Sequence, residues 1–311
     1  MKDHGGCSRC SCIVGSGRSS NHRRSRKRVC HLSCLFYPLV VARSGPNKQA
    51  LDPVGQVQPP TVEGLPDGYF YRVTRYADVV LERAFADRFY DLRAALEGFA
   101  PTLDELIAGG GNQTPFVKRF DQSLRVMHDG GVWGARKITI EKWIGFDGDT
   151  EQVSKERSHE IDMFGVGSIS EPFPGVAVEM EWNNKDPFFD RDLIRFQALH
   201  REDAIAVGVV VTRGPELQAL LKEVIRNDYG RGPSKYGAST THWGKLMQRM
   251  DLGGGGECPL LLIGIEPPRI QGIERAYESR DARAEAKLLR RDGGYEDRLV
   301  DAYRLMLGPA G

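Results

Sequence analysis

An uninterrupted apolar run, Ala204–Val211, constrains the fold more than any other feature of this chain. The run reads AIAVGVVV, and an apolar run of this length that is rich in β-branched residues is typical of a strand buried on both faces. A helical pattern from Asp186 to about His200 precedes it, and Pro215 starts another helical pattern after it. Because such a strand needs helices on both faces of its sheet, the run predicts an α/β fold with a mixed β-sheet flanked by helices.

Other segments fit the same fold class. Alternation predicts strands near Ile138 and over Val176–Trp182, and a third strand is expected at Pro259–Ile265. Helical spacing predicts a helix over Ala77–Phe99 and a second that starts at Thr114 and Pro115. We therefore expect residues 61–311 to form a single domain, with its core at about 112–265 and a C-terminal helical region at 273–307.

The first 60 residues differ from the rest of the chain. They hold ten Lys/Arg against two Asp/Glu, and five of the six cysteines. Cys7-x-x-Cys10 together with Cys30 and Cys34 has the spacing of a zinc knuckle, but the Gly, Ser and Arg around them favour a disordered leader. Only Cys258 lies in the body, which excludes a disulfide framework there and indicates a reducing compartment, so we expect a cytoplasmic protein.

Charge excludes one class of function for the body. Residues 61–311 hold 33 basic and 40 acidic side chains, so this part of the chain is not a generic basic binder of nucleic acids. No stretch of eighteen apolar residues is present, which argues against a membrane-spanning helix. Any contact with DNA must therefore come from a local site.

Three carboxylates are the candidate catalytic and metal-binding residues. In the strand Val176–Trp182, Glu179 and Glu181 point to the same side, and Asp162 precedes Glu179 by sixteen intervening residues. Buried carboxylates on one face repel each other unless a cation or a proton offsets the repulsion, and Mg²⁺ prefers such oxygen ligands. The alternative is that the two glutamates lie on a solvated strand face.

This pattern resembles the BamHI and BglII restriction endonucleases over about Asn112–Ile265. It is similar to the PD-(D/E)xK nuclease motif with Glu181 in place of the usual lysine, as in BamHI, whereas BglII has glutamine there. The residues that carry the resemblance are Asp162, Glu179, Met180, Glu181, Asn183, Asn184, Arg191 and the strand Ile205–Val211.

The resemblance implies a restriction-endonuclease-like core that acts as a homodimer on palindromic double-stranded DNA with Mg²⁺, or with Mn²⁺ in its place. It implies that Asp162 and Glu179 are metal ligands, together with the Met180 carbonyl, and that Glu181 orients or deprotonates the attacking water. A further acidic residue upstream of Asp162 is expected, and the candidates are Glu141, Glu156 and Glu160. The products would carry 5′-phosphate and 3′-hydroxyl ends, and a DNA methyltransferase would protect the host.

Two segments are candidates for reading DNA, because amide, basic and hydroxyl side chains can contact base edges and phosphates. The alternatives are helix capping by Asp186 for the first segment and a flexible insert for the second. The candidate side chains are Asn183, Asn184, Lys185, Asp186 and Arg191 after the catalytic strand, and Lys235, Tyr236, Ser239, Thr240, Thr241, His242 and Lys245 within Tyr229–Arg249.

We therefore predict a sequence-specific, Mg²⁺-dependent DNA endonuclease of type II. Two alternatives remain open from the sequence. One is a repair nuclease on the same core that cuts by DNA structure, and the other is a DNA-binding regulator without catalysis.

Overall fold

The computed structural model describes residues 62–108, 113–146, 148–155, 159–226, 233–291 and 293–308. The cysteine-rich leader and Glu156 lie outside these residues, so the predictions made for them stay predictions. Within the described ranges no helix is both long and apolar enough to cross a bilayer.

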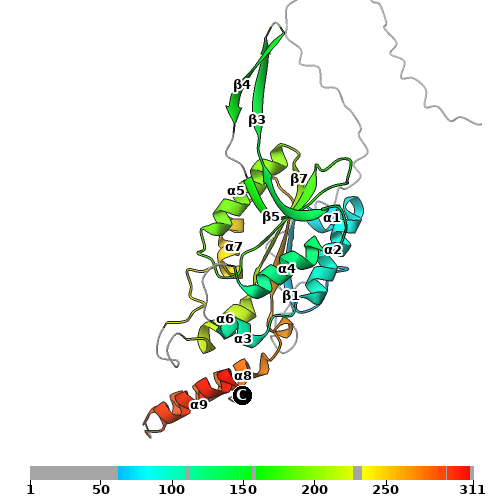
Figure 1. Ribbon diagram of the computed structural model, residues 1–311. Coiled ribbons are helices and arrows are strands. Elements are labelled where there is room, and N and C mark those ends of the chain that lie inside the picture. The colour runs from blue at the N-terminus through cyan, green and yellow to red at the C-terminus, as the bar shows by residue number, and fades with distance from the viewer. Residues whose placement is uncertain are drawn as a thin grey trace, which may run out of the picture. The chain divides into compact units, whose positions relative to one another are not determined.

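A six-stranded sheet in the order β1-β8-β7-β6-β5-β2 forms the centre of the fold (Figure 1). The β6–β7 and β7–β8 pairs are parallel and the other pairs are antiparallel, which confirms the predicted mixed sheet. The strands are β1 (Tyr69–Thr74), β2 (Trp133–Ile138), β5 (His159–Gly165), β6 (Gly175–Met180), β7 (Ile205–Arg213) and β8 (Leu260–Ile265).

Helices cover both faces of this sheet. Side chains of α1 to α4 and α6 pack with one set of strand residues in the larger apolar core. Side chains of α5 and α7 pack with the opposite set in a second core. The helices are α1 (Ala77–Ala84), α2 (Ala86–Gly98), α3 (Leu103–Ile107), α4 (Pro115–Arg125), α5 (Phe188–Arg201), α6 (Pro215–Val224) and α7 (Trp243–Asp251), followed after β8 by α8 (Glu274–Leu288) and α9 (Tyr295–Leu307).

The apolar run at 204–211 forms β7, in the interior of the sheet with a parallel neighbour on each side. Its branched residues are almost fully buried, as expected for a strand that is covered on both faces. Gly208 is required within the run, because a Cβ there would lie 2.4 Å from the Phe196 ring of α5. The glycine therefore lets α5 pack closely on the strand.

The structure differs from the sequence predictions in four places. The sheet includes β1, so the core begins well before residue 112. The helix predicted over Ala77–Phe99 breaks at Phe85, whose backbone is not helical. Residues 141–155 form a separate two-stranded ribbon, β3 (Glu141–Phe146) and β4 (Asp149–Lys155). Helix α7 begins at Trp243, within Tyr229–Arg249, where no helix was predicted.

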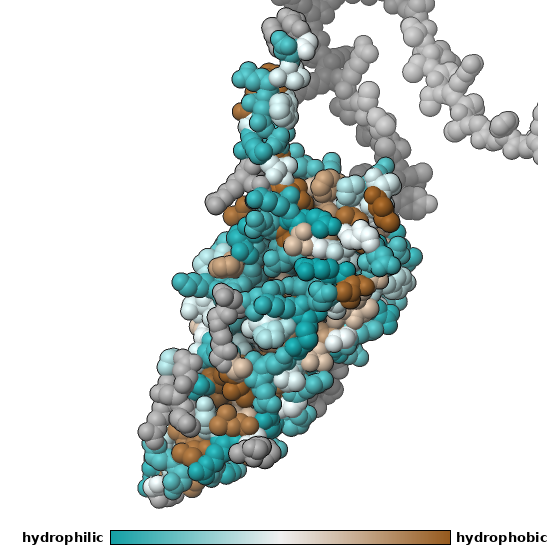
Figure 2. All heavy atoms as spheres, in the orientation of Figure 1, coloured by the Kyte–Doolittle hydropathy of each residue, from teal (hydrophilic) through white to brown (hydrophobic). Residues whose placement is uncertain are grey.

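The ribbon and the C-terminal helices complete the fold. Figure 2 shows the ribbon as mostly hydrophilic with isolated apolar side chains, and Trp143, Ile144 and Val153 are exposed on it. Helices α8 and α9 follow β8 and pack on each other.

Candidate active site

Strand β6 positions the two glutamates as its alternation predicts. Val176, Val178 and Met180 face the larger core, whereas Ala177 faces the second core. Glu179 and Glu181 lie on the same side of the strand as Ala177, and they are only 1% and 2% exposed. This burial contradicts the alternative of a solvated strand face. Two carboxylates are thus held out of water at the end of a central strand.

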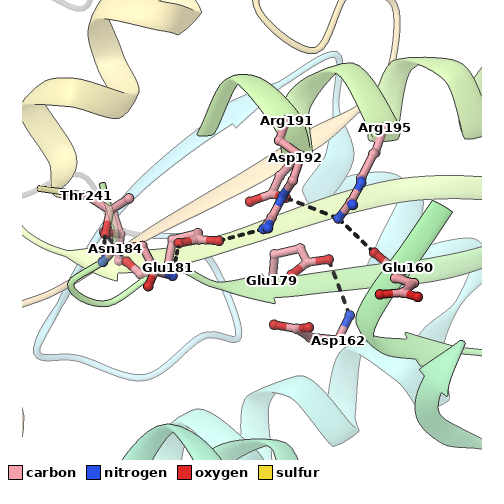
Figure 3. A network of polar contacts seen from close by, with 10 residues as sticks. Glu160, Asp162, Glu179, Glu181, Asn184, Arg191, Asp192, Arg195 and Thr241 are labelled. Atoms are coloured by element: carbon pink, nitrogen blue, oxygen red, sulfur yellow. Dashed lines mark hydrogen bonds and ion pairs between the residues drawn. The ribbon is translucent and has the colours of Figure 1, made fainter. Parts of the chain in front are cut away.

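Asp162 lies beside Glu179. Strand β5 pairs with β6 in the register Met163–Val178, which places Asp162 next to Glu179 one position further on. The Asp162 backbone N–H donates a hydrogen bond to Glu179 Oε1 at 3.3 Å. The Glu179 side chain thus accepts from an N–H group that would pair with a backbone carbonyl in a regular strand ladder. Asp162 itself is exposed. The fold therefore brings together the three carboxylates that the sequence separates, as Figure 3 shows.

A fourth carboxylate, Asp192, was missed by the sequence analysis. It lies in the first half of α5, is fully buried, and has one oxygen within 4.8 Å of oxygens of both Glu179 and Glu181. A signal for it exists in the sequence, because Asp192 lies between Phe189 and Phe196 on the inward stripe of the helix. An acidic residue on an apolar stripe needs a partner, and here its neighbours are other carboxylates.

Burial and mutual repulsion raise the pKa values of this cluster. Burial, and after it the charge of Asp192, raises the pKa of Glu181 to about 8. The pKa of Glu179 lies well above its usual range because of burial and the charges of Asp192 and Asp162. Burial also raises the pKa of Asp192. Each shift means that the ionised cluster is unfavourable unless a cation lies close to it.

Arginine side chains of α5 supply part of that positive charge. Arg191 donates from Nη2 to Glu181 Oε1 at 2.9 Å and from Nε to Asp192 Oδ1 at 2.7 Å. Arg195 lies 3.8 Å from the same Asp192 oxygen and donates to the Glu160 carbonyl (Figure 3). Arg191 was predicted to contact DNA, and in the structure it contacts the acidic cluster.

The donor set fits a hard divalent cation. Mg²⁺ and Mn²⁺ prefer carboxylate oxygens, and the oxygens of Glu179, Glu181 and Asp192 converge within 4.8 Å. Asp162 adjoins this group through Glu179. Met180 lies in the strand between the two glutamates with its side chain in the core, so only its backbone is free for a ligand role.

The upstream acid expected from the resemblance is best matched by a residue outside the three named candidates. Asp121 of α4 is buried, and burial and the charge of Asp162 raise its pKa to about 6. Its Oδ2 accepts a hydrogen bond from Gln113 at 2.5 Å. Asp121 also lies on an apolar stripe, with Val117 and Leu124, so the same helical signal indicates it.

The structure corrects the candidates Glu141 and Glu160. Glu141 belongs to the separate ribbon, where its carboxylate pairs with Lys155 at 2.7 Å. Glu160 points its carboxylate toward Lys137, 3.9 Å away, and both side chains are largely exposed. Proximity to Asp162 in the sequence does not indicate Asp121, because α4 reaches β5 only through the tertiary fold.

The structure also corrects two of the predicted DNA contacts. Tyr236 is 1% exposed, and its hydroxyl donates to the Leu106 carbonyl at 2.8 Å. Thr241 is fully buried, and its Oγ1 accepts from the Asn184 backbone N–H at 3.1 Å. Their polar atoms anchor the segment internally, so neither side chain presents a surface to DNA.

Other predicted contacts have internal partners but remain at least partly accessible. Lys235 donates to the carbonyls of Leu106 and Ala108, and His242 caps α7 by accepting from the Gly244 N–H. Asp186 forms ion pairs with Lys245 and Arg249 at 3.4 Å each. Asn184, Lys185 and Ser239 are exposed, and Asn183 and Thr240 are partly buried.

One comparison with known proteins found a match for this part of the chain. The profile of the family described as restriction endonuclease BglII/BglIII matches residues 69–265. The matched region begins with β1 and ends with β8, so it spans the whole central sheet and both sides of the acidic cluster. No curated protein matches the chain significantly.

Proposed function

Because the chain belongs to the restriction endonuclease BglII/BglIII family, and is thus a nuclease that acts on DNA, we propose that it is a type II, Mg²⁺-dependent, sequence-specific endonuclease. The observation that carries the proposal is the pair of buried glutamates at the end of β6 beside Asp162. Four carboxylates, three of them with raised pKa values, favour a cation nearby, and a metal-dependent nuclease uses such a cation beside the phosphate.

The residues divide into distinct roles. Asp162, Glu179 and the Met180 carbonyl would hold Mg²⁺, or Mn²⁺ in its place. The bound ion would lower the pKa of a water molecule and neutralise charge on the phosphate. Glu181, whose pKa is raised to about 8, would accept a proton from the attacking water. Asp121 takes the place of the upstream acid, since its charge interacts with Asp162.

The accessible side chains around Glu181 would contact DNA. Asn side chains pair with adenine and Lys or Arg with guanine, whereas hydroxyls serve either base edges or phosphates. We infer that the target is palindromic double-stranded DNA read by a homodimer, with 5′-phosphate and 3′-hydroxyl ends, and that a methyltransferase protects the host DNA. The residues proposed for these contacts are Asn183, Asn184, Lys185, Asp186, Arg191, Ser239, Thr240 and Lys245.

Digestion of a long DNA of mixed sequence tests the proposal. We expect discrete fragments with Mg²⁺, none with EDTA, and none with the Glu179→Ala variant in Mg²⁺. Ligation of the fragments without prior treatment would show 5′-phosphate and 3′-hydroxyl ends. Glu160→Ala is the matched control, because it removes an exposed carboxylate of the same sheet.

The remaining functions give different results. A structure-specific nuclease would cut branched or nicked DNA and give no discrete fragments from a linear duplex. A regulator without catalysis would bind DNA independently of Mg²⁺ and leave it intact. Discrete fragments that persist in Glu179→Ala would show that the active site lies elsewhere.

A further inference from the structure

Two segments that are distant in the sequence form one continuous surface next to Glu181. Lys185 and Thr240 form an antiparallel bridge. The Thr241 N–H donates to the Asn184 carbonyl at 2.8 Å, and the Asp186 N–H donates to the Ser239 carbonyl at 3.1 Å. The segments 183–186 and 239–241, here named the paired loops, therefore hold each other in register through their backbones.

A single buried arginine lies at the junction of the paired loops. Arg213, the last residue of β7, is fully buried. Its Nη1 donates to the Trp182 carbonyl and to Asn183 Oδ1, the latter at 3.1 Å. Its Nη2 donates to Thr240 Oγ1 at 2.7 Å. One guanidinium group thus contacts both segments at once.

The surroundings of Arg213 fix its orientation. Its Nε donates to Gln218 Oε1 at 2.7 Å, and Gln218 Nε2 donates in turn to the Tyr236 carbonyl at 3.0 Å. The guanidinium carbon lies 4.7 Å from the centre of the Tyr236 ring and 5.5 Å from that of Trp182. Aromatic faces and carbonyl oxygens therefore surround the guanidinium group on several sides.

All hydrogen-bond acceptors of Arg213 are uncharged carbonyl, amide or hydroxyl oxygens. Among the described residues Arg213 forms no ion pair with a carboxylate. A buried cation without a counter-ion is costly, which is reflected in a pKa lowered by burial to about 9. Stability alone would favour an apolar residue at this position. The rigid five-donor fork has a positional use that an apolar residue lacks, because it joins separate acceptors.

The paired loops are also connected to the catalytic carboxylate. Asn184 Nδ2 donates to Glu181 Oε2 at 2.5 Å. Thr212, which precedes Arg213, donates from Oγ1 to the Glu181 carbonyl at 2.7 Å. A displacement of the paired loops would therefore move Glu181 or break its hydrogen bonds.

We propose that Arg213 is a positioning residue that fixes the paired loops against each other and against Glu181, and so determines how strictly the DNA sequence is selected before cleavage. The inference rests on the proposed function and names a determinant of its specificity. Arg213 has no exposed surface, so it acts on DNA only through the residues that it orients. Loosened loops would accept neighbouring sequences while the metal-binding carboxylates stay in place.

The test uses Arg213→Lys, which keeps the charge but cannot join the acceptors as a fork. Mixed-sequence DNA is digested by the full chain in Mg²⁺, and the cut ends are sequenced. We expect one consensus for the wild type and a relaxed consensus for the variant. For each protein we compare kcat/KM for the consensus duplex with kcat/KM for duplexes that differ by one base pair. This ratio should be about tenfold or more lower for the variant than for the wild type, because one mismatched base pair typically changes binding by about that factor.

Arg283→Lys is the matched control, because Arg283 is another buried arginine but bonds the Val224 carbonyl at 3.2 Å, away from the paired loops. Its consensus should equal that of the wild type. Gln218→Met is the second variant, since it removes the two hydrogen bonds that orient Arg213 and Tyr236 at similar side-chain volume. It should relax the consensus in the same direction even if Arg213→Lys does not fold.

The outcomes separate the two proposals. The role of Arg213 would be overturned if both variants kept the wild-type consensus. If Arg213→Lys does not fold, the same result for Gln218→Met would overturn it. An equal loss of kcat/KM on all sequences would also overturn it, because that is the result of a purely structural residue. Absence of Mg²⁺-dependent cleavage by the wild type would instead overturn the proposed function, and this inference with it.

Discussion

Two buried carboxylate sites in this molecule have opposite surroundings. Asp91 of α2 accepts hydrogen bonds from Arg88 at 3.0 Å and Trp133 at 2.8 Å, and contacts His128 at 2.7 Å. Glu179, by contrast, accepts from one backbone donor and has three carboxylates as neighbours. Burial alone therefore does not distinguish the sites. The number of donors does, since a satisfied carboxylate stabilises the fold whereas an unsatisfied group of carboxylates is suited to bind a cation.

The largest effect is expected from a change at the functional site, which should reduce cleavage without reducing stability. Glu179→Gln should lower the Mg²⁺-dependent cleavage rate by about 10²–10³-fold, the usual loss when one group that stabilises the transition state is removed. The metal-free variant should be at least as stable as the wild type, because an amide avoids the free-energy cost of burying this carboxyl group among other carboxylates. Single-turnover cleavage and urea unfolding in EDTA measure the two effects. A large loss of stability would show that Glu179 is structural, like Asp91.

The structural site should respond in the opposite way. Asp91→Ala leaves the buried Arg88 with only the exposed Asp87 at 4.0 Å, so the free energy of unfolding should fall by about 3 kcal/mol. The cleavage rate per folded molecule should not change. Urea unfolding and active-site titration at a temperature where the variant is folded check this pair of outcomes. Normal stability would mean that the Asp91 hydrogen bonds contribute little.

The functional site should contribute to the pH dependence of the free energy of unfolding. The pKa of Glu181 in the fold, about 8, lies above its ordinary value of 4.5. Its contribution to stability is therefore complete below pH 4.5 and is lost as the pH rises through about 8. Between pH 6 and pH 9 the metal-free protein should lose about 1–3 kcal/mol of unfolding free energy.

Urea unfolding in EDTA at both pH values measures this loss, and Glu181→Gln should reduce it. Ca²⁺ or Mg²⁺ should restore stability more strongly at pH 9 than at pH 6, because the ion binds the deprotonated cluster. An equal pH dependence in Glu181→Gln would assign the effect to other groups.

The smallest effect is expected at Glu141, which the sequence grouped with the catalytic acids. Glu141→Gln removes only an exposed ion pair within the ribbon, so cleavage should change by less than about twofold. Asp121→Asn, the corresponding change at the acid that the fold brings near Asp162, should lower cleavage clearly. Equal rates for the two variants would remove Asp121 from the site.

Local pattern was enough to predict the elements that position the site. The alternation of Val176–Trp182 predicted that Glu179 and Glu181 share one side, and the apolar run predicted the strand β7 beside them. Each of these features depends on a short repeat of side chains along one strand. The fold class followed from the same patterns, and the family profile agrees with it.

Contacts between distant segments could not be predicted in this way. Asp192 joins the cluster from α5, whereas Asp121 of α4 approaches Asp162 from the opposite face of the sheet. Tyr236 is buried although Ser234 and Lys235 next to it are polar. A helical stripe shows that such an acid faces inward, but it does not show which residues it will meet.

The sequence by itself therefore determined the side of the strand on which each glutamate lies, because the direction of side chains along a strand depends only on backbone geometry. Tertiary structure alone decided that Asp192 completes the acidic cluster and that Arg213 joins two segments whose contacting residues lie 30 and 27 positions from it in the sequence. These contacts depend on how helices pack on the sheet and how loops meet at its end, and long-range packing sets both.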